Sequence, residues 1–581
     1  MDLSSISNID ILVFSAYCVL VVGVALYVSR TKNGEQKSSA DYFMAGNSLP
    51  WWAIGTGLIA ANISAEQLIG MTGSGFAIGL GIATYEWMAA ATLLIVAKFF
   101  VPIFLEKKIF TMPQFLEIRY DNRVRTSLAI FWLFLYVFVN LTSIIYLGTI
   151  AVKGVLGLEN TTQNTLIIAG IVALFSTIYT LSGGLMAVAW TDPIQVFFLI
   201  AGGLVTTYLA LDSLGDHHGM LAGFQVLYHE IPEKFSMILQ EGEILKSKPD
   251  GITPYVDLPK NGGDAYMDLP GLTVLVGAMW ITNLNYWGCN QYITQKALAA
   301  KSLKEAQRGL AFAGYLKLFM PVIVVIPGMA AYLLAQHHSP VLVGDIIRPD
   351  DTYPILLNSF LFPGVKGLAF AALFAAIVGA ISSKTNSIAT IFTMDIYKQF
   401  FNKSASERQL VRTGQIITLV SLAIAIPVVP VLGSFDQVFQ YIQEYTGFVS
   451  PGIFCIFVFG LFWKKASANA AVWVALLTLP VAIAFKFGTP SVPFLDRMGY
   501  TFIILSVVMV VISLINNKDG NDPGAIELSG SGKGDTLFSG GIGMKESGPV
   551  SEKSIFYTDP VFNIAAIGIC LILTVLYTAF W

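Results

Sequence analysis

Long apolar runs recur along almost the whole chain, and they constrain its fold more than any other feature. A helix that crosses a membrane needs about 20 largely apolar residues. Fourteen runs of this kind lie near residues 10–29, 51–75, 81–105, 127–152, 163–181, 185–211, 271–295, 309–335, 366–397, 413–432, 435–463, 467–486, 498–515 and 558–580. The sequence therefore predicts an all-α membrane protein with about fourteen transmembrane helices.

The composition excludes several classes of protein. Hydrophobic residues make up 55% of the chain and charged residues only 12%, whereas a soluble protein carries about 25% charged residues. The formal net charge of -3 indicates no basic surface for nucleic acid. We exclude a soluble enzyme, a nucleic-acid-binding protein and a disordered scaffold. We expect a multi-pass protein embedded in the lipid bilayer of the cell membrane, which is the inner or plasma membrane.

Histidine and cysteine also limit the chemistry. All five histidines lie in polar stretches between apolar runs, and the four cysteines have no metal-binding spacing. The sequence therefore predicts no haem, zinc or histidine proton relay at membrane depth. We expect no organic cofactor. We also expect no membrane-embedded enzyme, because the apolar runs have neither a catalytic metal set nor paired acids.

The distribution of lysine and arginine predicts the orientation. If the loops alternate between two sides, one side holds 22 of these residues and the other holds 9. Cytoplasmic loops carry the excess of positive charge. This rule places the N-terminus outside and, with an even number of spans, the C-terminus outside as well. The pattern gives no prediction of the oligomeric state.

Three runs contain polar residues and glycines at mid-depth. The first has Asn62 and Gln67, the second has the stretch 282–288, and the third has the stretch 440–452. Irregular backbone at membrane depth persists only where it lines a cavity. The first two runs are five spans apart, so they cross the membrane in opposite directions. Broken helices at matching positions of two inverted halves are typical of a transporter; the alternative is two ordinary helices that contain glycine.

Polar side chains on these spans favour a ligand with many hydroxyl groups, because amides, a carboxylate and an ammonium can each donate to or accept from hydroxyls. Strongly anionic ligands are disfavoured, since the arginines lie in loops or at span ends. The alternative for each buried charge is an ion pair that only holds helices together. The candidate polar residues are Asn62, Gln67, Glu86, Asn283, Lys317 and Gln443, and flat or apolar faces for a sugar ring come from Met71, Tyr85, Tyr286, Trp287 and Phe439.

Long strings of this chain resemble the sodium/solute symporter family and, within it, the bacterial sodium/galactose (sodium/glucose) symporter branch. They include ADYFMAGNSLPWWAIGTGLIAANISAEQLIG, YEWM, VNLTSIIYLG, AWTDPIQVFF, NYWGCNQYITQKALAAKS, TIFTMDIYK, FQYIQEYTGFVSPG and GLFWKK. The resemblance runs from about residue 8 to the last residues. It implies a LeuT-like core of two inverted five-helix repeats, with one helix before the core and three after it.

The expected organisation follows from this resemblance and from the loops. It comprises an N-terminal helix and inside loop (1–50), the first inverted repeat (51–213), an outside loop (214–270), the second inverted repeat (271–463), two peripheral helices (464–516), a flexible inside linker (517–557) and a C-terminal helix (558–581).

The resemblance also implies roles for single residues. The expected sugar contacts are Gln67, Glu86, Asn283, Lys317 and Gln443, with Asn62 close by. Tyr286 is expected to be an inner gate stacked on the sugar, with Trp287 beside it, and the expected outer lid is Met71, Tyr85 and Phe439. Two positions depart from the family, because Ala89 stands where a serine is frequent and Asn285 where an aromatic residue is usual.

The sodium site departs from the family more seriously. The resemblance places the ion between the break in the first core helix and the eighth core helix. Its carbonyl ligands map to Ala60, Ile63 and Ala376, whereas its two serine ligands map to Gly379 and Ala380. By analogy with other hard cations, losing two oxygen ligands weakens the site. Asp192 matches an acid on the sodium exit path.

Lys384 offers an alternative to the ion. It lies four residues after Ala380, on the same helical face. Side chains in a helix lean toward its N-terminus, so the ammonium of Lys384 can lie over Gly379 and Ala380 and pair with Asp192.

The expected function is import of a galactose- or glucose-like hexose by alternating access, with sodium as the default coupling ion. One alternative is sodium-independent or proton-coupled sugar transport with Lys384 in place of sodium. Another is a transport-inactive sugar sensor of the same fold, which is expected less because no output domain follows Trp581.

Overall fold

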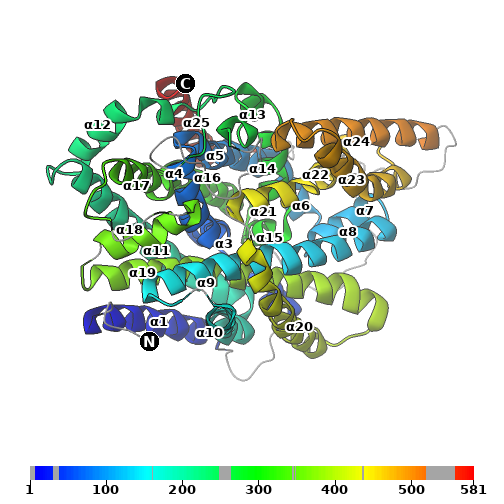
Figure 1. The fold of residues 1–581 in the computed structure, drawn as a ribbon. Coiled ribbons are helices and arrows are strands. Elements are labelled where there is room, and N and C mark those ends of the chain that lie inside the picture. Colours follow the sequence, from blue (N-terminus) through cyan, green and yellow to red (C-terminus); the bar gives the residue numbers. More distant parts are fainter. Residues whose placement is uncertain are drawn as a thin grey trace.

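The computed structural model describes residues 7–30, 38–159, 161–247, 263–342, 346, 348–360, 362–434, 438–517 and 557–581. The regular elements in these residues are helices, apart from two isolated β-bridges. Several long helices run roughly parallel to one another (Figure 1). The predicted all-α fold class is therefore confirmed.

The described residues of the first half form twelve α-helices, and short π- or 3₁₀-helical segments join some of them into longer rods. The α-helices are α1 (Asn8–Val28), α2 (Ser39–Met44), α3 (Trp51–Asn62), α4 (Thr72–Ala77), α5 (Thr84–Ile95), α6 (Val101–Glu106), α7 (Met112–Arg119), α8 (Asn122–Leu135), α9 (Thr142–Leu156), α10 (Thr162–Gly183), α11 (Leu185–Leu214) and α12 (Met220–Glu230). The joining segments include η4 (Glu66–Met71), η5 (Leu80–Ala83), η6 (Val96–Phe100) and η7 (Tyr136–Leu141), and η8 (Pro232–Phe235) follows α12.

The second half continues in the same way. Its α-helices are α13 (Leu272–Val276), α14 (Ala278–Cys289), α15 (Gln291–Leu298), α16 (Leu303–Val324), α17 (Ile326–Gln336), α18 (Thr352–Phe360), α19 (Val365–Ile391), α20 (Glu407–Val428), α21 (Val438–Gly447), α22 (Ser450–Phe462), α23 (Ala468–Gly488), α24 (Phe494–Asn517) and α25 (Pro560–Ala579). The π-helical segment η11 (Phe392–Phe401) extends α19.

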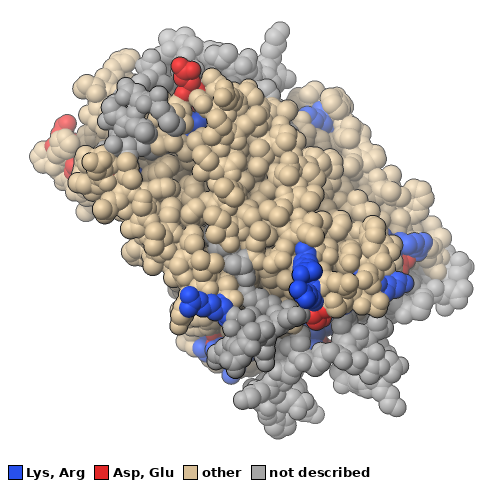
Figure 2. Space-filling model, turned by 90° about the horizontal axis from the view of Figure 1, so that it is seen from below, with Lys and Arg blue, Asp and Glu red and all other residues tan. Residues whose placement is uncertain are grey.

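Ten of the described helices are long and apolar enough to cross a membrane, and a pair bent by 80° would make an eleventh. The predicted spans 51–75 and 163–181, and residues 438–463 of the span 435–463, are also mainly helical, but they are broken or have shorter apolar stretches. The face in Figure 2 is a wide surface of uncharged residues, on which charged side chains form only a few separate groups. The chain is therefore a multi-pass membrane protein, and the count of fourteen spans stays a prediction.

The first predicted break is confirmed. Helix α3 ends at Asn62, Ile63 is extended (φ -79°, ψ 103°), and the chain re-enters a π-helical turn at Glu66. The amide of Ser64 donates to Oε1 of Gln67 at 3.0 Å. A side chain therefore satisfies backbone that the break releases, as a membrane interior requires.

The second predicted break lies elsewhere than expected. The stretch 282–288 is helical within α14, and the chain bends instead at Gly277 and at Asn290, which is extended (φ -81°, ψ 129°). The polar side chains bond to carbonyl oxygens one turn back, Thr282 to Ala278 at 3.1 Å and Asn283 to Met279 at 3.2 Å. Polar residues that bond to their own helix do not break it.

Close packing of small residues brings the core helices together. Helix α11 packs along α19, and α3 packs against both helices and against α16. A Cβ placed on Gly202 of α11 would lie 2.6 Å from the Cβ of Ala372 on α19. Glycine and alanine permit such approach between membrane helices, and this contact positions the candidate ion site described below.

The first and last described helices are held by hydrogen bonds to other parts of the chain. Asp10 of α1 accepts from the amides of Gly364 and Gly367, at 2.7 Å each, at the start of α19. The amide of Met237 donates to the carbonyl oxygen of Phe580 at 2.8 Å. The first helix thus contacts the start of α19, and the C-terminal helix contacts the segment after α12, whereas the placement of both termini outside stays a prediction.

Lys234, in the segment after α12, caps the end of α4. Its ammonium donates to the carbonyl oxygens of Phe76 at 3.2 Å and Ala77 at 3.1 Å. It also lies 4.1 Å from the centre of the Tyr332 ring. A cation is favourable at the C-terminal end of a helix, so this lysine fastens the segment after α12 to the core.

We expect a pH-dependent effect of Lys234 on stability. Burial lowers the pKa of Lys234 from its ordinary 10.5 to about 8, against the opposing effect of Glu233. Between these values the unfolded chain holds a proton that the folded chain has released, so the free energy of unfolding rises with pH. From about pH 7 to about pH 9.5, the melting temperature of the native protein should rise relative to that of Lys234→Met. The exposed Lys301→Met is the control, and a constant difference for Lys234→Met would contradict the assignment.

Candidate functional site

A cavity in the middle of the helix bundle collects residues from the broken helix α3–η4 and from α5, α14, α16, α19 and α21. About 70 Å³ of it accommodates the centres of water-sized molecules, which is several times the space that one water needs. Most of the predicted substrate and gate residues line it: Asn62, Gln67, Tyr85, Glu86, Asn283, Tyr286, Trp287, Lys317, Phe439 and Gln443. The structure therefore brings predicted residues from distant positions of the chain to one cavity, and their roles stay predictions.

A buried polar network lies at one wall of this cavity. The ammonium of Lys317 donates to Oε2 of Glu86 at 2.5 Å and also to Oδ1 of Asn62. Nδ2 of Asn62 in turn donates to the hydroxyl of Tyr286 at 2.8 Å. Lys317 also lies 5.3 Å from the centre of the Trp287 ring. These contacts join α3, α5, α14 and α16, and they fix the orientation of groups that a ligand would meet.

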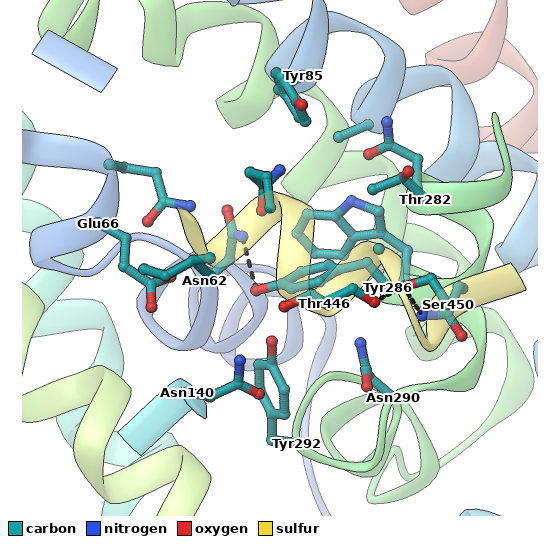
Figure 3. A pocket seen from close by; sticks show the side chains of 18 of the residues that line it. Asn62, Glu66, Tyr85, Asn140, Thr282, Tyr286, Asn290, Tyr292, Thr446 and Ser450 are labelled. Atoms are coloured by element: carbon teal, nitrogen blue, oxygen red, sulfur yellow. Dashed lines mark hydrogen bonds between the residues drawn. The ribbon is translucent and has the colours of Figure 1, made fainter. Parts of the chain in front are cut away.

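The gate residues lie on different sides of the cavity. Figure 3 shows the ring of Tyr286 across its middle, with Tyr85 on one side and Asn140, Asn290 and Tyr292 on the other. The rings of Tyr85 and Phe439 meet edge to face at 5.7 Å between centres.

Met71 does not belong to this set of lining residues. It is fully buried in the core, so the structure does not place it at the outer lid in this conformation.

The cavity also contains polar residues that were not among the predicted site residues. Glu66 is the charged residue among them, and a charge within an apolar run is the signal that could have found it. Four others lie in the polar stretches 282–288 and 440–452 that the sequence analysis noted: Thr282, Asn285, Thr446 and Ser450. The remaining three are Asn140, Asn290 and Tyr292. The structure finds them because η7, α15 and α22 converge on the break of α3.

Lys384 lines the same cavity, but its partner is not the one expected. Its ammonium lies 3.9 Å from Oε1 of Glu66 and 5.0 Å from the centre of the Tyr292 ring. The expected pair with Asp192 is wrong, because Asp192 binds Lys296. Lys384 thus connects α19 to the residue that follows the break of α3.

The pair of Asp192 and Lys296 is fully buried. The predicted span 271–295 ends one residue before Lys296, whereas the structure places this lysine within α15. A Cβ on Gly57 would meet Cδ of Lys296 at 2.8 Å and Oδ2 of Asp192 at 3.1 Å. The pair therefore packs directly against α3, one turn before Ala60.

The predicted sodium positions on α3 and α19 do meet. The three atoms nearest to a Cβ placed on Gly379 belong to Gln195 and to the carbonyl group of Ala60, whose oxygen would lie 3.4 Å away. Gly379 and Ala380 are buried and contribute no side-chain oxygen. Ile63 directly follows the end of α3, and Ala376 precedes Gly379 by three residues in α19. The residues present therefore fit a cation held by carbonyl and amide oxygens.

Comparison with known proteins agrees with this geometry. Residues 42–478 match the model of the sodium:solute symporter family. The chain belongs to that family, and it is a transporter and not an enzyme.

Similar proteins include sodium/glucose cotransporters and a sodium/myo-inositol cotransporter. The chain is 47% identical to a sodium/glucose cotransporter of Vibrio parahaemolyticus, over 99% of both chains. It is 31% identical to sodium/glucose cotransporter 2 of Rattus norvegicus, over 83% of this chain and 72% of that one. It is also 31% identical to sodium/myo-inositol cotransporter 2 of Oryctolagus cuniculus, over 81% and 68%.

A solved structure has a similar fold. It is a Na⁺-coupled sialic acid symporter in a substrate-bound, outward-open state, with a TM-score of 0.73 and 21% sequence identity. The match covers 88% of this chain and 98% of that one. This likeness supports the symporter fold. The predicted division into domains and repeats stays a prediction.

We expect the Glu86–Lys317 pair to be strongly coupled. Lys317→Met leaves a carboxylate buried without its ammonium, which should lower the free energy of unfolding by about 3–5 kcal/mol. The double variant Glu86→Gln with Lys317→Met should be more stable than Lys317→Met alone. Denaturation of the purified variants in detergent measures the free energy of unfolding of each.

The control pair is Lys486 and Glu444, whose side chains are about a quarter exposed. Lys486→Met should change stability by less than about 1 kcal/mol. Additive effects of Glu86→Gln and Lys317→Met would contradict the coupling.

Proposed function

We propose that this protein imports a galactose- or glucose-like hexose by alternating access, coupled to sodium. The observation that carries the proposal is the buried network of Asn62, Glu86 and Lys317 in a cavity faced by aromatic rings. The 47% identity to a sodium/glucose cotransporter supports it.

The charge of the cavity favours a neutral ligand. Its charged lining residues are two acids and two lysines, Glu66, Glu86, Lys317 and Lys384. Each acid lies beside one of the lysines, at 2.5 Å for Glu86 and 3.9 Å for Glu66. An anion or a cation would disturb this balance in a site of low dielectric constant, whereas a sugar adds hydroxyls without adding charge.

The amides offer groups that match hydroxyls. Because Oε1 of Gln67 accepts from Ser64, its Nε2 is the group that can donate to a sugar. Because Nδ2 of Asn283 donates to Met279, its Oδ1 is the group that can accept. Gln443 lies on the same cavity wall as Phe439. The proposed sugar contacts are therefore Gln67, Glu86, Asn283, Lys317 and Gln443, with Asn62 holding Lys317.

Movement of the sugar inward requires the ring of Tyr286 to turn aside. Its hydroxyl accepts from Asn62 at 2.8 Å, and its ring meets those of Trp287 and Tyr292 at 5.2 and 5.7 Å between centres. We assign Tyr286 as the inner gate, and Tyr85 with Phe439 as the outer lid.

A second candidate differs only in coupling. Lys384 is buried and links α19 to Glu66 beside the break of α3, the two elements that the family's sodium joins. In this alternative the lysine ammonium makes the link permanently, and sugar transport is sodium-independent or driven by a proton.

The deciding measurement is uptake of labelled galactose and glucose by proteoliposomes in sodium, potassium and choline media. We expect the native protein to require sodium, and Lys384→Met to keep that requirement. Equal uptake in the three media, with loss of uptake in Lys384→Met, would instead establish the second candidate. No counterflow of any hexose or polyol by a well-folded protein would indicate a sensor of the same fold.

Tyr286→Ala should weaken sugar binding. The substitution removes a ring contact worth about 0.5–1.5 kcal/mol, so the sugar Kd should rise by roughly twofold to tenfold. Tyr208, which is 48% exposed on α11, provides the control substitution Tyr208→Ala. An unchanged Kd in a well-folded Tyr286→Ala protein would rule out the gate assignment.

A further inference from the structure

Helices α3, α11 and α19 meet at Gly379, which has no side chain. A Cβ placed there would overlap Oε1 of Gln195 on α11 and lie 3.4 Å from the carbonyl oxygen of Ala60 on α3. The side chain of Gln195 is 2% exposed. Two buried oxygens therefore converge on the position where the family resemblance expects a serine hydroxyl.

We propose that Oε1 of Gln195 is a ligand of the coupling sodium ion and takes the place of the hydroxyl that Gly379 lacks. The inference rests on the proposed sodium coupling and names a ligand for it. Hard cations prefer oxygen, and amide oxygens serve as ligands beside backbone carbonyls. The carbonyl oxygens of Ala60, Ile63 and Ala376 would complete the protein's share of the site.

The end of α3 provides suitable oxygens. Ala60 lies in its last turn, where carbonyl groups lack helical partners and carry partial negative charge. The amide of Ser64 would donate to Ala60 in a continuous helix, but it donates to Oε1 of Gln67. The break therefore leaves the Ala60 oxygen facing Gly379 and Gln195.

A buried acid lies one turn from Gln195. Asp192 precedes it by three residues on α11, and both side chains face α3, Asp192 at Gly57 and Gln195 beside Ala60. Oδ2 of Asp192 accepts from Lys296, whereas Oδ1 has no hydrogen-bond partner in the described part of the chain. This unpartnered carboxylate oxygen is fully buried, so a further oxygen acceptor lies one turn from Gln195, while Lys296 balances the charge of Asp192.

Lys384 does not take this place. Its ammonium is held at Glu66 and Tyr292, and the three atoms nearest to the position at Gly379 belong to Gln195 and Ala60. Gln195 in its present position also requires a glycine at residue 379, because a side chain there would overlap its Oε1.

The test measures sodium binding without transport. The purified full-length protein is titrated with sodium chloride against choline chloride at constant ionic strength, and the rise in melting temperature gives the sodium Kd. Gln195→Leu should raise this Kd by about tenfold or more, because loss of a group that supports a metal site weakens binding by about 10–100-fold.

Gln307→Leu is the matched control. Gln307 is 1% exposed, and its Nε2 donates to the carbonyl oxygen of Tyr557 at 3.0 Å, away from this site. The variant should melt at a lower temperature than the native protein, with an unchanged sodium Kd.

A swap of the two side chains distinguishes a ligand from a packing residue. Gly379→Ser alone should not strengthen sodium binding, because Gln195 occupies the space. Gln195→Ala combined with Gly379→Ser should recover most of the affinity that Gln195→Ala loses, because the hydroxyl replaces the amide oxygen. Recovery of this kind is not expected if Gln195 only fills space.

The outcomes separate this inference from the proposed function. A native protein that responds to sodium, with an equal response in Gln195→Leu, overturns the ligand assignment and leaves sodium coupling intact. A native protein with no sodium response and no sodium-dependent uptake overturns both. Loss of the response in Gln195→Leu and its recovery in the swapped variant support the assignment.

Discussion

Backbone that leaves the helical path inside a membrane must find its hydrogen bonds within the protein, and the site depends on how this chain meets that requirement. The break after Asn62 is stabilised by Gln67, whose side-chain oxygen accepts from the amide of Ser64. The same break directs Asn62 toward Lys317 and the Ala60 carbonyl group toward Gly379. One interruption of α3 thus creates both the candidate sugar site and the candidate ion site.

Much of this arrangement could be predicted from the sequence, because polar residues are rare in apolar runs and each one must have a use. Asn62, Glu86 and Lys317 were found in this way, and they contact one another. Hydropathy alone misplaced Lys296, since a lysine after an apolar run resembles the start of a loop. Gln195 gave no signal, because a single glutamine in an apolar helix does not reveal which glycine of a distant helix it faces.

In three ion pairs of buried or nearly buried side chains, the acid and the lysine come from different repeats. The acids Glu66, Glu86 and Asp192 belong to the proposed first repeat, and their partners Lys384, Lys317 and Lys296 belong to the proposed second repeat. Removing one member of such a pair is more harmful than replacing both by apolar residues. The pairs therefore fix which faces of the two repeats meet. Any rearrangement that separates the repeats must provide new partners for these charges.

This division of charge has a consequence for the synthesis of the protein. A chain is made from its N-terminus and its first part folds earliest, so the three acids enter the membrane before their lysines exist. An ionised carboxylate is expensive in hydrocarbon. Until α15, α16 and α19 arrive, the first repeat has to keep its acids beside water or in neutral form. The first repeat thus remains incompletely folded during biogenesis. Insertion of the second repeat neutralises its three acids and permits its final packing.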